Sequence, residues 1–201
     1  MRTDRPTHRA AARAAALVAL LSLVLALALP WGVGSDHPYG DEHLYLDYGD
    51  RMQAGDLPYR DFYVEYPPGA LPVFVGPALV DGHETTAFRV LMAVLWAVAA
   101  GAAVATAARA GIAGRRLALV GIGAVGYVAV FSPLLLNTYD AWPAALVAGA
   151  LLAFTARRDG LAGAALGLAV AAKLLPVLLL PLLWLAARRR GAGTRLLAAF
   201  V

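Results

Sequence analysis

The sequence contains no cysteine and few charged residues. None of its 201 residues is Cys, and Asp, Glu, Lys and Arg together make up 15%, against about 25% in a typical soluble domain. The absence of cysteine excludes a disulfide framework, a thiolate nucleophile and zinc bound by cysteine. The low charge, the 61% of hydrophobic residues and the mean hydropathy of +0.67 exclude a soluble cytosolic enzyme and a disordered tail.

Hydrophobic residues instead form long uncharged runs. A helix that spans a bilayer needs about 20 apolar residues, and the runs predict spans over 14–33, 86–108, 117–136 and 141–156. The basic segment 1–13 before the first run also fits a cleaved signal peptide, but the run is longer than a usual signal core and more spans follow, which favours a retained anchor. The predicted fold class is an all-α polytopic membrane protein.

The net charge of +4 lies in short basic clusters between the runs, which is typical of membrane topology and not of a nucleic-acid surface. We therefore expect a lipid bilayer and no nucleic acid as partner. Clusters of Lys and Arg mark the cytoplasmic side, which places the N-terminus there. Segment 34–85 holds ten of the thirteen acidic residues and is predicted to be extracytoplasmic, in a multi-pass protein of the cell membrane.

The apolar region 160–187 is interrupted by Lys173, Pro176 and Pro181. Arginines stand before and after it, so both of its ends are predicted to be cytoplasmic. This pattern favours a broken hairpin of short helices with Lys173 at its turn, and the alternative is one long Pro-kinked helix. Residues 194–201 begin a further apolar run, so we expect the front part of a longer membrane protein.

The acidic outer segment has its own helical pattern. Leu44, Tyr48 and Met52 recur every four residues, which predicts an amphipathic helix over 41–54. Tyrosines suit a membrane interface, so this helix is expected to lie on the membrane surface. Gly55 is a stop signal at its end.

Clustered carboxylates beside a membrane suit proton transfer, since a carboxylate in a partly dry cleft can take a proton from an attacking hydroxyl. Asp41 and Glu42 follow the first span closely, and adjacent residues on a helix face different ways, so at most one points into a site. Asp41 is the first candidate base, and its alternative role is a helix N-cap. Asp36 and Asp61 are the other candidates.

A metal is the less favoured reading of the same loop. His37 and His43 lie close to these acids, and such groups can hold a divalent cation. Their spacing matches no specific metal motif, so we expect no cofactor, with a divalent cation as the alternative.

Three segments of the chain carry a family resemblance. They are the acidic pair Asp41-Glu42 with 55–62 and 65–69, then 137–144, then 163–176. With them the chain resembles the GT-C type integral membrane glycosyltransferases, and it is most similar to the polyprenyl-phosphate-mannose-dependent alpha-mannosyltransferases of family 87. The resemblance implies a GT-C-like helix bundle with a structured acidic first outer loop.

The resemblance also implies a reaction. The donor would be a sugar on a polyprenyl phosphate, with mannose as the first candidate. The acceptor would be a hydroxyl of a lipid or cell-envelope glycan. A loop carboxylate acts as base and the anomeric centre is inverted. The leaving phosphate ester is a stable anion, so no second carboxylate is needed, unlike glycoside hydrolysis.

A leaving phosphate needs positive charge, for which the candidates are Lys173, Arg89 and Arg60. A lysine within the membrane is costly and is by default a functional-site hypothesis, with snorkelling to the interface as the alternative. Asp140 is a second site carboxylate or an N-cap for the fourth span. Further candidate site residues are Tyr59, Glu65, Tyr66, Asn137, Tyr139 and Asp140.

Two other classes of protein stay open at this point. A transporter-like bundle would also use an intramembrane lysine and broken helices, but it predicts an inverted repeat that the sequence does not show. A non-catalytic membrane scaffold or subunit would use the acidic loop to bind partners.

Overall fold

The computed structural model describes residues 8–34 and 40–201, and this part of the chain is built from helices without a β-strand. The predicted all-α class is confirmed. Among the described residues, three helices are long and apolar enough to cross a membrane. These are α1 (His8–Ala28), α4 (Glu84–Arg109) and α5 (Gly114–Leu135).

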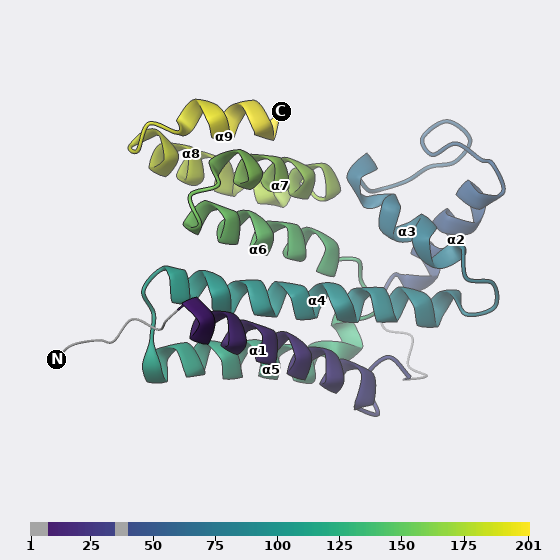
Figure 1. Ribbon diagram of the computed structural model, residues 1–201. Coiled ribbons are helices and arrows are strands. Elements are labelled where there is room, and N and C mark those ends of the chain that lie inside the picture. Colours follow the sequence, from purple (N-terminus) through teal and green to yellow (C-terminus); the bar gives the residue numbers. More distant parts are fainter. Residues whose placement is uncertain (1–7, 35–39) are drawn as a thin grey trace.

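Helix α4 lies at the centre of the bundle (Figure 1). It packs against α1 on one side and α6 (Ala141–Thr155) on the other, and α5 contacts both α1 and α4. Helices α1 and α4 approach closely because Gly101 has no side chain: a Cβ there would lie 3.0 Å from the carbonyl oxygen of Ala15. With 15 residues, α6 is about 22 Å long, shorter than the about 30 Å of a bilayer core.

Beyond α6 the chain turns back on itself, and its segments are α7 (Asp159–Ala172), the 3₁₀ helix η2 (Leu175–Leu179), α8 (Leu180–Arg188) and α9 (Gly193–Phe200). An ion pair joins Arg190 to Asp159, so the two ends of this region meet at the same end of the bundle. Helix α9 then runs alongside α7 (Figure 1).

The segment between α1 and α4 forms a cap of three helical pieces at one end of the bundle (Figure 1). They are α2 (Glu42–Gln53), η1 (Pro68–Ala70) and α3 (Pro72–Ala78). Tyr45 and Tyr48 of α2 are buried and pack on Phe74 of α3, with ring centroids 4.9 and 5.9 Å from it. The tyrosine face of α2 was predicted to lie on the membrane surface. In the structure it packs against protein instead.

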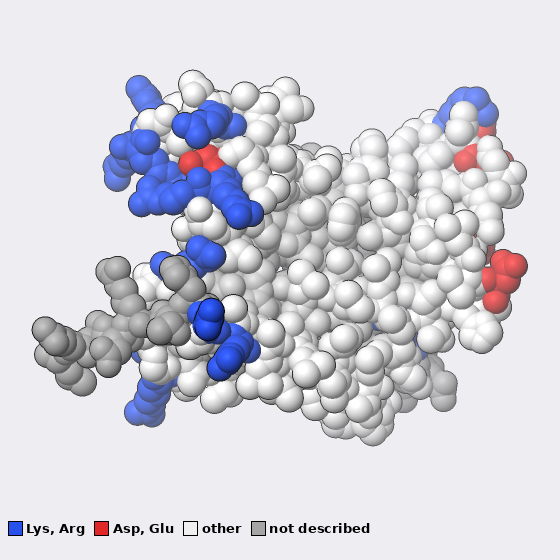
Figure 2. All heavy atoms as spheres, viewed as in Figure 1, with Lys and Arg blue, Asp and Glu red and all other residues white. Residues whose placement is uncertain are grey.

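The two ends of the bundle differ in charge. Figure 2 shows Lys and Arg gathered at the end where α4 finishes and α7 begins. Acidic side chains lie mainly at the opposite end, around the cap of α2 and α3. This asymmetry is the property from which an orientation in the membrane is inferred.

Candidate functional site

Three chain segments converge where the cap meets the bundle, and two glycines allow their close approach. Gly40, at φ +98°, leads into α2, and a Cβ on it would lie 2.7 Å from the carbonyl oxygen of Asn137. Gly69 lies on the end of α7, where a Cβ would come within 2.5 Å of the Ala171 backbone. The Trp142 indole N–H donates to the Gly69 carbonyl at 2.9 Å. The start of α2, the α5–α6 turn and the end of α7 are therefore neighbours.

A buried ion pair lies beneath this junction. The Arg89 guanidinium donates to both carboxylate oxygens of Glu42, at 2.9 and 3.1 Å, and to the side-chain oxygen of Asn137 at 3.1 Å. All three residues are buried, with at most 8% of their surface exposed. Removing one partner of such a buried pair costs about 3–5 kcal/mol, because it leaves an uncompensated charge. This geometry favours a positioning role for Glu42, Arg89 and Asn137 over the catalytic and phosphate-binding roles predicted for the two charged residues.

A second ion pair lies nearer the surface. The Lys173 ammonium donates to the Asp140 carboxylate, and the two side chains are 40% and 45% exposed. The Lys173 Nζ also lies 5.3 Å from the ring centroid of Tyr139. Exposed pairs contribute only about 0–1 kcal/mol, so this ion pair can open at little cost. The Asp140 side chain makes no capping hydrogen bond to α6.

Tyrosine rings form the wall beside this pair. The Tyr66 ring packs edge-on against Tyr139 and Tyr45, with centroids 4.8 and 5.5 Å apart. Burial raises the pKa of the Tyr66 phenol; a hydrogen bond with Tyr45 and the Lys173 ammonium lower it, and the Asp41 carboxylate raises it further. Lys173 lies against Tyr139, which packs on Tyr66, and the Asp41 carbonyl accepts the N–H of Tyr45, whose ring also packs on Tyr66. Asp41 and Lys173 therefore flank the half-buried Tyr66.

Asp41 stands immediately before α2 and is exposed. Its backbone carbonyl accepts the N–H groups of Leu44 and Tyr45, at 2.9 and 3.1 Å, whereas its side chain makes no capping hydrogen bond. The first turn of α2 is thus held by the Asp41 backbone, and the carboxylate stays at the surface of the junction.

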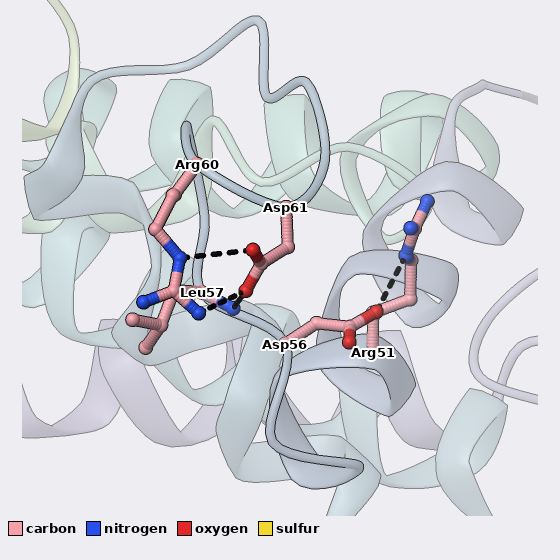
Figure 3. A network of polar contacts seen from close by, with 5 residues as sticks. All are labelled: Arg51, Asp56, Leu57, Arg60 and Asp61. Carbon is pink, nitrogen blue, oxygen red and sulfur yellow. Dashed lines mark hydrogen bonds and ion pairs between the residues drawn. The ribbon is translucent and has the colours of Figure 1, made fainter.

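Asp61 and Arg60, two of the predicted site residues, form an ion pair with each other (Figure 3). The guanidinium donates to both carboxylate oxygens, at 2.7 and 2.9 Å, and the Leu57 N–H donates to the same carboxylate at 2.8 Å. Arg60 first, and then the Leu57 N–H, hold the pKa of the Asp61 carboxyl below its ordinary value. A carboxylate with a lowered pKa is a weaker base, so this geometry favours a role in the turn for both residues.

The remaining predicted residues lie around the junction or outside the described part. Tyr59, at φ +64°, donates its hydroxyl to the Tyr66 carbonyl at 2.6 Å, and Glu65 is exposed. His43 is exposed on α2, while Asp36 and His37 fall outside the described residues. Within 8–34 and 40–201, no group of three or more His, Cys, Asp or Glu residues is placed to hold a metal ion.

The structure thus brings one set of the predicted residues together at the junction: Asp41, Tyr66, Tyr139, Asp140 and Lys173. The sequence analysis assigned no role to Gly40 and Gly69, which allow the segments to meet, or to Trp142, which ties η1 to α6. In the sequence, the only feature that could have pointed to these residues is their position: Gly40 precedes Asp41, Gly69 ends a Pro-Gly turn, and Trp142 lies two residues after Asp140.

Comparisons with known proteins give one family. A comparison with curated proteins gives no match, and neither does a comparison with solved structures. Residues 63–201 match the model of glycosyltransferase family 87. This segment is more than half of the chain, and it contains Tyr66, Tyr139, Asp140 and Lys173 of the junction while beginning after Asp41. The chain therefore belongs to glycosyltransferase family 87 and is a membrane glycosyltransferase.

Proposed function

We propose that the protein transfers a sugar, for which mannose is the first candidate, from a polyprenyl phosphate donor to a hydroxyl of a lipid or cell-envelope glycan. The observation that carries this proposal is the half-exposed Lys173–Asp140 pair beside Tyr139 and Tyr66, with Asp41 close by. This arrangement places a cation, a carboxylate and aromatic rings that can pack against a sugar at one end of a membrane bundle.

A lipid-linked donor suits the surroundings of Lys173. Leu174, Leu175 and Leu178 follow it directly and are 66–68% exposed, so apolar surface adjoins the ammonium group. A phosphate at Lys173 could therefore continue into a hydrocarbon chain lying along η2, in the membrane. A water-soluble nucleotide sugar would gain nothing from this apolar surface.

The proposed step needs one base and one cation. Asp41 takes the proton of the acceptor hydroxyl while that oxygen attacks the anomeric carbon from the face opposite the phosphate. The bond from the anomeric carbon to the phosphate oxygen breaks, and the polyprenyl phosphate leaves as an anion held by Lys173. The configuration is inverted, and the proton on Asp41 passes to water. Since the leaving group is already a stable anion, no general acid is required.

Asp140 has a separate part in this proposal. It holds the Lys173 ammonium in place before the donor arrives, and the phosphate then takes over one or more of the ammonium hydrogens. Opening the pair costs little because both side chains are partly exposed and such pairs are weak. The buried Arg89–Glu42 pair cannot be opened so cheaply, which is why Lys173 and not Arg89 is assigned to the phosphate.

The test is a transfer assay in membranes that carry the protein in its native form. Labelled mannose is supplied either on a polyprenyl phosphate or on a nucleotide, and the product linkage is read by NMR. We expect transfer from the lipid donor alone, with inverted configuration, and none in membranes without the protein. Transfer from the nucleotide sugar in the absence of any lipid donor, or a retained configuration, would contradict the proposal.

A further inference from the structure

A separate hollow lies at the basic end of the bundle, away from the junction described above. It is bounded by α1, α4, α6 and α7, and its volume is about 550 Å³. Apart from two leucines and two arginines, every residue that lines it is Ala or Gly. The hollow exists because these side chains are too small to fill the space between the helices. We call it the basic pocket.

The basic pocket reaches from the end of the bundle into its apolar part. Its wall on α6 runs from Gly149 to Ala156, which is about 10 Å along a helix axis. A Cβ added to Gly149 would meet nothing within 4 Å, so this glycine opens the inner part. Leu152 and Leu161 line the same space. A group bound here would be polar at one end and apolar at the other.

Two arginines give the pocket its charge. Arg109 is the last residue of α4, and Arg158 immediately precedes α7; both are exposed, and both line the pocket. The ion pairs within the described part of the chain involve neither of them. The neighbouring acid, Asp159, is buried in its own pair with Arg190. Both guanidinium groups can therefore turn to an external anion.

We propose that the basic pocket binds the phosphate headgroup of an anionic membrane lipid. Arginine binds phosphate strongly through charge-assisted, bidentate hydrogen bonds. Basic pockets between membrane helices at the positive end of a protein suit lipid headgroups. The phosphate lies between Arg109 and Arg158, and the glycerol and first acyl carbons enter the Ala- and Gly-lined slot. A free phosphate would leave that slot unused, so the lipid is the occupant that fits both parts.

Bound lipid would contact α1, α4, α6 and α7 at the same time. A ligand that binds the folded state stabilises it by mass action, so the lipid would hold the ends of α1, α4, α6 and α7 together. This site is at the opposite end from the Lys173–Asp140 junction, and it does not depend on the proposed reaction.

The test measures lipid retention by native mass spectrometry on the protein purified from its membranes, with phosphatidylglycerol or phosphatidylcholine added. The double variant Arg109→Gln/Arg158→Gln should retain about tenfold less phosphatidylglycerol, or still less, because each arginine near a membrane surface contributes to the binding of anionic lipid. Its matched control is Arg115→Gln/Arg116→Gln, which removes two exposed arginines from the same end and should change retention less than twofold. Phosphatidylcholine should change little in either.

A second pair of variants tests the slot. Gly149→Phe fills it and should lower phosphatidylglycerol retention, whereas Gly123→Phe, on an exposed and open position of α5, should not. Thermal unfolding checks that each variant is folded. Unchanged retention in the arginine double variant, or equal loss of both lipids, would overturn the proposal. So would competition by inorganic phosphate as effective as competition by the lipid, which would show a free-phosphate site.

Discussion

At the scale of single residues, the two ion pairs near the junction differ in how far they are buried. Glu42 and Arg89 are buried, and the Arg89 guanidinium is also bonded to Asn137. Lys173 and Asp140 are 40% and 45% exposed in their side chains. The first pair holds segments in place, while the second can exchange one partner for a ligand. A role in donor binding is therefore proposed for Lys173, the only lysine in the chain.

The first prediction concerns that lysine. Lys173→Gln should raise the KM for the lipid-linked donor and lower kcat/KM by about 10–100-fold, since the loss of a charged hydrogen bond costs about 1.5–3 kcal/mol. Lys173→Arg should keep part of the activity. Thermal stability should change little, because the pair with Asp140 is partly exposed and such pairs are weak. Steady-state kinetics with varied donor check this, and an unchanged donor KM in the glutamine variant would remove Lys173 from the site.

Residue roles were the least predictable part of the site. Asp41, Glu42 and Asp61 are all acids of one segment, and only three-dimensional contacts separate their roles. Glu42 meets Arg89, which lies 47 positions away, and Asp61 meets its neighbour Arg60. No local pattern encodes a contact between positions that far apart, so partners of this kind require the fold.

At the scale of elements, the buried pair connects α2 to α4 and to the α5–α6 turn. Arg89→Met should destabilise the protein by about 3–5 kcal/mol, because it leaves the Glu42 charge buried without compensation. The double variant Arg89→Met/Glu42→Gln should be less destabilised than the sum of the single changes. Unfolding in detergent measures both. Arg116→Met, at an exposed position, is the control and should change stability by less than about 0.5 kcal/mol; additive effects of the two pair variants would argue against coupling.

Helices α7 and α9 give a second prediction at this scale. A Cβ on Gly163 would lie 2.1 Å from the Leu196 carbonyl oxygen, whereas one on Gly123 of α5 would meet nothing within 4 Å. Gly163→Ala should destabilise by about 1–3 kcal/mol through overpacking. Gly123→Ala should be neutral or stabilise by up to about 1 kcal/mol, because Ala is the better helix former. Denaturation of the two variants distinguishes the outcomes, and equal effects would mean that α7 and α9 are not in close contact.

Helix class was predictable because the length and hydrophobicity of a run determine it directly. The all-α class is confirmed, and so is the family resemblance. Helix α3 was not predicted; it contains Pro72 and Pro77, and Pro72 suits the first turn of a helix. The buried face of α2 was assigned to the membrane because apolar and aromatic spacing is the same whether a helix packs on lipid or on protein.

At the scale of the whole molecule, the charge asymmetry of the bundle predicts its orientation. The cap should face outward and the arginine-rich end inward. The chain has no cysteine, so single cysteines report on accessibility without background. In intact cells a membrane-impermeant maleimide should label Tyr63→Cys, which replaces a side chain 79% exposed in the cap. Arg116→Cys should react only after the membrane is opened. Labelling in the reverse order would invert the proposed topology.

The most direct test of the account is the activity of Asp41→Asn beside Asp61→Asn, in membranes supplied with the lipid-linked donor. Loss of a general base lowers the rate by about 10²–10⁴-fold, so Asp41→Asn should fall by that factor with the donor KM unchanged. Asp61→Asn, whose carboxylate is occupied by Arg60, should stay within about twofold of the parent. Full activity in Asp41→Asn would contradict the central claim that the carboxylate at the start of α2 takes the acceptor proton.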